Sequence, residues 1–169
     1  MPPVATGPRQ QIELIEKAKG KPRVDDRSKI ANSISRFMTC FDTKDWDEMS
    51  SALGDPVRID YSDLRRQPPS TISRAEYIKA RESALGHTRT HHLISNFDVR
   101  VTGDHATMKA SCMIYREMEE DYFNSHALYE FGLERDGDDW LIVSITQEIL
   151  WNDGNPQAHS GVPNTTKPA

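Results

Sequence analysis

The sequence predicts a single α+β domain in which helices pack on one face of a curved, mostly antiparallel sheet. Three observations predict this class. Helical periodicity is confined to the first half of the chain, four strand-like segments follow it, and short turn sequences separate those strands. Helices grouped before an antiparallel sheet are typical of α+β domains. A length of 169 residues is sufficient for one domain with its own hydrophobic core.

The two ends of the chain differ in composition from the middle. Residues 1–25 contain four of the 10 prolines, and residues 152–169 are rich in Gly, Pro, Asn and Thr. Such compositions are typical of flexible ends. We therefore expect a flexible N-terminal arm over residues 1–25, a folded domain over 26–151 and a flexible C-terminal tail over 152–169.

Three helices are expected before the main group of strands. An amphipathic helix over about 26–42 is indicated by helical spacing of Ile30, Ile34, Phe37, Met38 and Phe41. A second helix, over about 45–53, should end at the turn sequence Gly54-Asp55-Pro56. The capping box Ser73-Arg74-Ala75-Glu76 opens a third helix, which Gly86 should close.

The expected strands alternate with turns. Val57-Arg58-Ile59-Asp60-Tyr61 alternates apolar and polar side chains, whereas residues 65–69 are expected to form a loop. The four later strands span about 89–101, 106–118, 122–135 and 140–151. Thr102-Gly103-Asp104 and Arg135-Asp136-Gly137-Asp138 are typical hairpin turns, so these strands should form an antiparallel meander.

The last expected strand is apolar on both faces. Its even positions include Trp140, Ile142 and Leu150, and its odd positions include Leu141, Val143, Ile145, Ile149 and Trp151. Helices on one face of the sheet would leave the other face uncovered. The simplest cover is a second copy of the chain, so a homo-oligomer is expected.

Composition excludes several functional classes. Lys+Arg 21 against Asp+Glu 26 gives a net charge of −5 at pH 7, which argues against nucleic-acid binding and against docking on anionic lipid. No apolar stretch approaches the ~20 residues of a membrane helix, and the N-terminus lacks the apolar core of a signal peptide. A soluble cytoplasmic protein is therefore expected. Cys40 and Cys112 are expected to be buried thiols.

Three aspartates lie near the end of the first helix. Asp45 is a natural N-cap for the second helix, and from spacing alone Asp42 and Asp47 are also best interpreted as helix-end or turn residues. Asp42 differs because it follows Phe41 at the edge of the apolar face. A carboxylate that loses hydration there has a raised pKa unless a cation or donor pairs with it.

Two adjacent histidines lie near the start of the strand over 89–101. Neighbouring strand residues point to opposite faces, so one of His91 and His92 should face the helices; Asn96 shares the face of His92. A histidine paired with a carboxylate in a pocket can act as a general acid or base, and a hydrogen-bonded structural histidine is an equal alternative. His87 and His91 have zinc-ligand spacing on a helix, but the strand pattern breaks that geometry, so no metal site is expected.

Several tyrosines and one histidine on the strands are further candidates. Tyr61, Tyr115 and Tyr129 fit core or rim positions, or a phenol that reaches a cavity to polarise a carbonyl. His126 lies in mid-strand and fits a half-buried, hydrogen-bonded ring. The chain has no glycine-rich phosphate loop, dinucleotide fingerprint or Gly-x-Ser-x-Gly motif, so nucleotide and redox chemistry are not indicated.

Three segments resemble one known family. Phe41-Asp42-Thr43-Lys44-Asp45-Trp46-Asp47, Val57-Arg58-Ile59-Asp60-Tyr61 and Thr90-His91-His92 are similar to motifs of scytalone dehydratases, fungal enzymes of melanin synthesis. More broadly, residues 26–151 resemble the SnoaL-like branch of the nuclear-transport-factor-2-like superfamily. The resemblance implies a cone-shaped α+β barrel whose sheet curls around a helix-lined pocket. It also implies no cofactor, a small-molecule substrate and a trimer, with a dimer as the alternative.

The resemblance implies an acid/base site as well. In scytalone dehydratases an aspartate–histidine pair moves a proton while a hydroxyl leaves, and two tyrosines hold a water against the substrate carbonyl. By motif, the pair corresponds to Asp42 and His92, and one tyrosine to Tyr61. Phe41 stands at the other tyrosine position. The family's second pocket histidine falls near Arg116.

We therefore expect a cofactor-independent dehydratase that acts on a cyclic hydroxylated polyketide or hydroquinone-type intermediate. His92 would move the proton, Asp42 would orient it, and Tyr61 would bind the carbonyl oxygen. The residues expected to contact substrate are Phe41, Asn96, Tyr115, Arg116, His126 and Tyr129. Tyr115 or His126 would compensate for the donor that Phe41 lacks. An isomerase or cyclase in the same pocket and a non-catalytic ligand-binding module are the alternatives.

Overall fold

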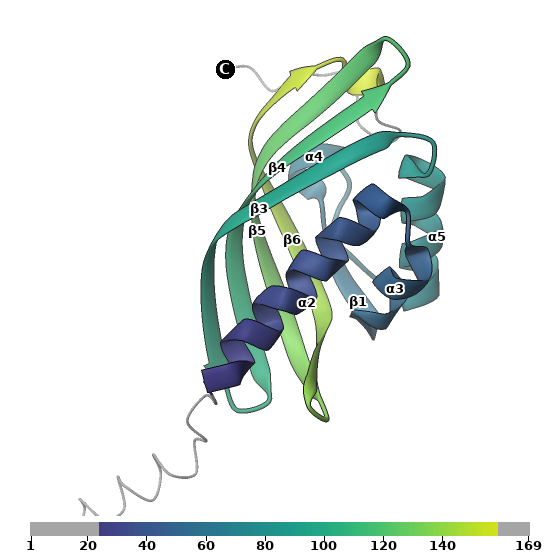
Figure 1. Ribbon diagram of the computed structural model, residues 1–169. Coiled ribbons are helices and arrows are strands. Elements are labelled where there is room, and N and C mark those ends of the chain that lie inside the picture. Colours follow the sequence, from purple (N-terminus) through teal and green to yellow (C-terminus); the bar gives the residue numbers. More distant parts are fainter. Residues whose placement is uncertain (1–23, 159–169) are drawn as a thin grey trace, which may run out of the picture.

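The computed structural model of the chain describes residues 24–158, with side chains over 26–157. Nearly all of the expected N-terminal arm and the distal part of the expected tail lie outside these residues. No helix in the described range is long and apolar enough to cross a membrane. Figure 1 shows a long, curved sheet with one helix crossing its face diagonally and shorter helices grouped at one side.

The three expected helices are present. Helix α2 (Val24–Thr43) buries the predicted apolar stripe, in which no side chain is more than 6% exposed. Helix α3 (Trp46–Ser51) begins after Asp45, whose carboxylate accepts the Glu48 N–H at 3.0 Å. Helix α5 (Arg74–Leu85) begins with the predicted capping box and ends at Gly86.

The strands form one six-stranded sheet. They are β1 (Leu53–Asp60), β2 (Ser70–Ile72), β3 (Arg89–Thr102), β4 (His105–Met118), β5 (Asp121–Asp136) and β6 (Asp139–Gly154), in the spatial order β2-β1-β6-β5-β4-β3. The antiparallel meander β3–β6 is confirmed. Gly103 and Gly137, with φ of 62° and 59°, make the hairpin turns that the sequence predicts.

The first half of the sheet differs from the expectation. Strand β1 begins at Leu53 rather than Val57 and pairs in parallel with β6, with a register shift between Leu53 and Arg58. Pro56 lies inside this shift, where the regular pairing is already interrupted. Its missing N–H therefore removes no hydrogen bond from the ladder. Helix α4 (Ser62–Arg65) and β2 occupy the segment around the expected loop. A four-residue helix is too short to show a periodic pattern.

The C-terminal boundary also lies later than expected. Strand β6 continues to Gly154, which pairs with Phe123 of β5, and a short 3-10 helix follows over Pro156–Ala158. Residues 152–158 are therefore ordered by pairing with the sheet and by the turn that follows it. The folded unit extends a few residues beyond the predicted end at 151.

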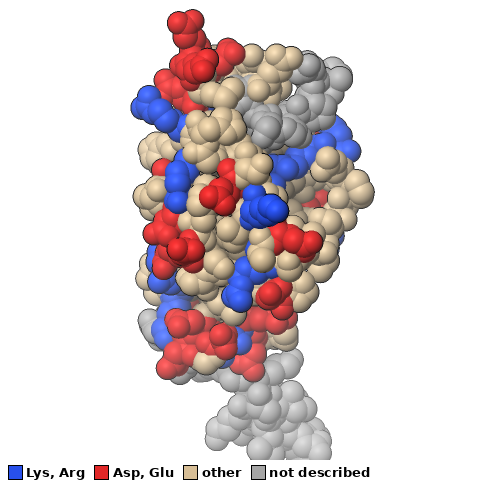
Figure 2. Space-filling model, turned by 90° about the vertical axis from the view of Figure 1, so that its right-hand side faces the viewer, with Lys and Arg blue, Asp and Glu red and all other residues tan. Residues whose placement is uncertain are grey.

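The two faces of the meander differ sharply. On the inner face, Ile114 of β4 and Phe131 of β5 are buried beneath the helices. On the outer face, Leu93, Met113, His126 and Trp151 are consecutive cross-strand partners from β3 to β6, and Leu93, Met113 and Trp151 are exposed. Figure 2, which views the side of the molecule at the right of Figure 1, shows acidic and basic side chains interspersed.

Candidate active site

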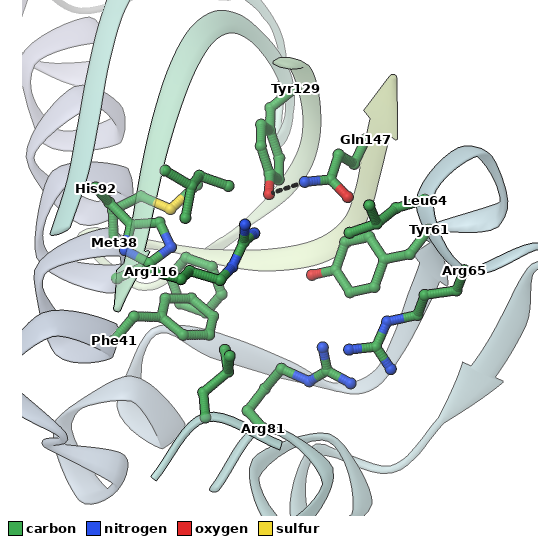
Figure 3. Close-up of a pocket in the computed structure, with 13 residues that line it drawn as sticks. Met38, Phe41, Tyr61, Leu64, Arg65, Arg81, His92, Arg116, Tyr129 and Gln147 are labelled. Carbon is green, nitrogen blue, oxygen red and sulfur yellow. Dashed lines mark hydrogen bonds between the residues drawn. The ribbon is translucent and has the colours of Figure 1, made fainter. Parts of the chain in front are cut away.

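A small cavity lies between the helices and the inner face of the sheet (Figure 3). Helix α2 supplies apolar walls through Phe37, Met38 and Phe41. The polar lining residues are Tyr61, Arg65, Arg81, His92, Arg116, Tyr129 and Gln147. The cavity volume of about 30 Å³ is sufficient for a water but not for a cyclic substrate. A larger ligand must therefore displace lining side chains.

Asp42, in the last turn of α2, binds His92 of β3 through two contacts. The His92 backbone N–H donates to Asp42 Oδ2 at 2.8 Å, and ring atom Nδ1 lies 2.6 Å from Oδ1. The His92 side chain is 5% exposed and lines the cavity. Within the described range, no hydrogen bond engages its other ring nitrogen, Nε2. The carboxylate therefore fixes the ring and leaves Nε2 for a substrate.

The surroundings set the charge of each partner. Burial raises the pKa of the Asp42 carboxyl, but the hydrogen bonds from the His92 side chain and backbone outweigh burial and hold that pKa below its ordinary value. Burial lowers the pKa of His92, against the opposing effect of Asp42. At neutral pH the pair is thus an ionised carboxylate and a neutral imidazole whose proton lies on Nδ1. Nε2 then presents a lone pair, as a general base requires.

Neighbouring residues join the end of α2 to the start of β3. The Phe41 ring stacks on His92, with centroids 5.0 Å apart. Thr90 Oγ1 donates to the Phe41 carbonyl at 2.9 Å and accepts from Lys44 Nζ at 3.1 Å. Because these bonds connect helix and strand directly, the relative positions of Asp42 and His92 are fixed by the fold.

Two phenols also reach the cavity. The Tyr61 hydroxyl lies 3.0 Å from that of the fully buried Tyr77; with Tyr77 as donor, the Tyr61 proton is free for a substrate oxygen. The Tyr129 hydroxyl accepts from Gln147 Nε2 at 2.6 Å and keeps its own proton to donate. Burial raises the pKa of Tyr129 well above its ordinary value, so this phenol stays protonated. Both hydroxyls can therefore stabilise negative charge on oxygen.

Three arginines complete the polar lining. Arg81 of α5 and Arg116 of β4 are 8% and 4% exposed. The guanidinium carbons of Arg65 and Arg81 lie 5.7 and 5.5 Å from the centroid of the Tyr61 ring. Arg116 Nη1 donates to Ser125 Oγ at 3.0 Å. Burial lowers the pKa of Arg65 and of Arg116 to about 10, which leaves both groups cationic at neutral pH.

The structure brings most of the predicted site together. Phe41, Tyr61, His92, Arg116 and Tyr129 line the cavity, and Asp42 reaches it through His92. His91 is exposed near Tyr115 on the outer face, so the prediction that the two histidines face opposite sides is confirmed.

Three residues predicted to contact substrate do not line this cavity. Tyr115 is 38% exposed and lines a separate surface groove of about 320 Å³. His126 stacks on Trp151 on the outer face, with ring centroids 4.2 Å apart. Asn96 has a φ of 58°, and its amide donates to Ser111 Oγ at 3.2 Å.

Strand geometry explains the positions of these three residues. Arg116 and Tyr129 face inward, so Tyr115 and His126, which have the opposite parity in β4 and β5, face outward. Asn96 has the parity of His92 but lies in a bulge between Ser95 and Asp98. The extra residues of a bulge break the alternation of faces, so parity no longer predicts direction there.

The cavity also contains residues that the sequence prediction missed. Arg81 lies on the buried stripe of α5 between Tyr77 and Leu85, at spacings of four residues. Gln147 lies in the buried row of β6 between two isoleucines. A charged or polar residue within an apolar row was the available signal for both. Arg65 carried no such signal because its segment was expected to be a loop.

Residues 22–146 match the SnoaL-like domain. The chain belongs to the SnoaL-like family. This SnoaL-like chain is 23% identical over 154 residues to the scytalone dehydratase-like protein claB of Passalora fulva, covering 83% of this chain and 94% of the relative.

Solved structures share the fold of this SnoaL-like chain. A protein from Kribbella flavida matches with a TM-score of 0.73 and 23% identity, over 76% of this chain and 93% of that one. A hexachlorocyclohexane dehydrochlorinase matches with a TM-score of 0.65 and 13% identity, over 86% of this chain and 92% of that one. The α+β fold of the nuclear-transport-factor-2-like proteins, predicted from the resemblance, is confirmed.

Proposed function

We propose that this SnoaL-like protein is a lyase that removes water from a cyclic hydroxylated ketone of polyketide or hydroquinone type, by acid/base chemistry of its side chains alone. One observation carries the proposal: Asp42 Oδ1 lies 2.6 Å from His92 Nδ1 while the ring of His92 lines the cavity. A ligand-binding module has no need for a buried, oriented base. The relative from Passalora fulva is named for its likeness to a dehydratase, which supports the same reaction class.

The proposed reaction uses two proton transfers through one imidazole. His92 Nε2 removes the proton from the carbon next to the ketone, and the electron pair moves onto the carbonyl oxygen, to which Tyr61 donates a hydrogen bond. The enolate then expels the hydroxyl group of the β-carbon. The imidazolium of His92 returns its proton to that hydroxyl, which leaves as water. Asp42 stays ionised and stabilises the imidazolium.

The same first step without loss of a hydroxyl gives an isomerase or a cyclase. The structural neighbour named as a dehydrochlorinase is an enzyme of elimination chemistry on this fold, and this favours elimination here. Product mass separates the two outcomes, because dehydration removes the mass of one water whereas isomerisation or cyclisation leaves the mass unchanged.

The test compares wild type with Asp42→Asn on a panel of cyclic β-hydroxy ketones, with products weighed by mass spectrometry. Wild type should release water from at least one member, and Asp42→Asn should lose this activity because the amide no longer stabilises the imidazolium. Asp47→Asn, which removes the same negative charge at an exposed position of α3, is the control. Full activity in Asp42→Asn would contradict the mechanism, and a product of unchanged mass would replace the lyase with an isomerase or cyclase.

We also propose that the outer face of the meander is covered by a second copy of the chain. The row from Leu93 through Met113 and His126 to Trp151 exposes apolar surface across four strands. Light scattering should give the mass of an oligomer, and Met113→Lys should shift it toward the monomer. A monomeric wild type at micromolar concentration would contradict this proposal.

A further inference from the structure

The cavity carries more positive charge than the proposed reaction uses. Arg65, Arg81 and Arg116 contribute three guanidinium groups, and none of the residues that line the cavity in the described range is acidic. Asp42 lies behind His92, and both of its carboxylate oxygens are engaged by that residue. The arginines therefore lack a balancing charge from the cavity walls.

Each of these arginines keeps a buried nitrogen without a hydrogen-bond partner in the described range. The atoms are Arg65 Nη2, Arg81 Nε and Arg116 Nε. Arg135 shows the contrasting arrangement, because Asp26 accepts two hydrogen bonds from its guanidinium at 3.0 Å. Burying a guanidinium nitrogen without an acceptor opposes folding, even where, as in Arg116, another nitrogen of the group donates to the Phe123 carbonyl and Ser125 Oγ. Such an arrangement is expected where a ligand supplies the missing negative charge.

The guanidiniums converge on the space beside Tyr61. In Figure 3 those of Arg65 and Arg81 lie next to each other below the Tyr61 ring, and Arg116 points into the centre of the cavity. Hydrogen bonds from Tyr61 and one further donor are enough to stabilise a single enolate oxygen. The remaining guanidinium donors exceed what the carbonyl end of the substrate can accept.

We propose that Arg65, Arg81 and Arg116 bind a carboxylate group of the substrate, which makes the substrate a cyclic hydroxylated carboxylic acid. The inference rests on the proposed function for the rest of the substrate. The planar guanidinium fork matches the two oxygens of a carboxylate. The aromatic rings of Phe37 and Phe41 supply apolar contact for a ring. No glycine lines the cavity in the described range, so the backbone cradle typical of phosphate sites is not among the lining groups.

Anchoring the carboxylate would also orient the reaction. In Figure 3 Arg65 and Arg81 lie across the cavity from His92, and Arg116, on the strand next to His92, extends toward them. A substrate held at its carboxylate would therefore present another part of its ring to Nε2. Because the cavity volume is only about 30 Å³, binding requires the guanidinium side chains to withdraw toward the walls around the bound anion.

Binding of benzoate, benzamide and inorganic phosphate, measured by calorimetry at neutral pH, tests the inference without an assay of activity. Benzoate should bind wild type at least ~10-fold more tightly than benzamide, its neutral isostere, because it adds charge-assisted hydrogen bonds. Arg81→Gln and the more exposed Arg65→Gln should each weaken benzoate about 10-fold or more. Arg27→Gln, on the exposed side of α2, should bind benzoate as wild type does.

The outcomes separate this inference from the proposed function. Asp42→Asn should bind benzoate at least as tightly as wild type, even though its lyase activity is lost. Equal binding of benzoate and benzamide, no benzoate binding to wild type, or equal weakening by Arg27→Gln would overturn the carboxylate site. Tighter binding of phosphate than of benzoate would overturn it in favour of a phosphorylated ligand. Circular dichroism confirms that each variant is folded, and Arg65→Gln keeps the test decisive if Arg81→Gln unfolds.

Discussion

The two walls of the cavity balance their charges in different ways. On one wall, the Asp42 carboxylate accepts both the backbone and the ring hydrogen bonds of His92, so the protein itself completes the pair. On the opposite wall Arg65 and Arg81, and with them Arg116, which extends toward them from the strand next to His92, each bury a nitrogen with no acceptor in the described range. The first arrangement is stable without a ligand, whereas the second is costly until an anion arrives.

This difference indicates that one wall holds the base and the other binds the substrate. A base must keep one defined orientation and protonation state through the reaction, which favours a fixed partner such as Asp42. A binding group gains affinity when its preferred partner is the ligand rather than another side chain. Mutations on the two walls should therefore have opposite consequences. Loss of the Asp42–His92 pair should abolish catalysis, whereas loss of an arginine should weaken substrate binding and raise the free energy of unfolding.

The largest effect is expected on the wall of the base. His92→Ala should lower product formation by on the order of 10³-fold, because it removes the imidazole that the Asp42 carboxylate holds at the cavity. His91→Ala is the matched control, since its ring lies on the outer face. The rates are measured on the substrate that the panel of hydroxy ketones identifies. Equal losses in the two variants would show that the inner face has no special role.

An intermediate effect is expected for the phenol between the walls. Tyr61→Phe should lower kcat about 10²-fold with a small change in KM, because its hydrogen bond strengthens as charge builds on the substrate oxygen. Tyr115→Phe, on the outer face, should leave both parameters unchanged. A rise in KM with unchanged kcat would instead assign Tyr61 to substrate binding alone.

The smallest effect, opposite in sign, is expected on the arginine wall. Arg81→Met should raise the free energy of unfolding by about 1 kcal/mol, because it replaces a buried unpaired cation with an apolar side chain of similar length. Arg27→Met should change it by less than about 0.5 kcal/mol, as usual for an exposed site. Urea unfolding measures both values. Destabilisation by Arg81→Met would mean that the cation is already balanced in the free protein.

Local patterns predicted much of the fold. The apolar stripe of α2, the capping box of α5 and the turns at Gly103 and Gly137 depend on residues close in sequence, and each is present. The parallel pairing of β1 with β6 joins segments about 85 residues apart, for which the strand pattern gives no signal. Helix α4 was missed because four residues are too few for periodicity.

The site was predictable only in part. Motif resemblance selected Asp42, His92 and Tyr61; in the structure His92 and Tyr61 line one cavity, and Asp42 is bound to His92. Strand parity correctly separates His91 from His92. The same rule places Tyr115 on the outer face, where the structure has it, and so argued against a role for Tyr115 in the cavity. The only sequence signal for Arg81 was its spacing of four residues from Tyr77 and Leu85, and this signal is weak because an arginine in a helix is normally solvated; its burial depends on how α5 packs.

The charge state of His92 tests the central claim most directly, through an NMR titration of the histidine side-chain nitrogens. His92 should titrate below its ordinary pKa of 6.5, with the neutral ring protonated on Nδ1 at neutral pH. Because the unfolded chain takes up this proton near 6.5, the associated stability should be present above that pH and lost as the pH falls toward the folded-state pKa. A His92 that is doubly protonated at neutral pH, or protonated on Nε2, would contradict its role as the base.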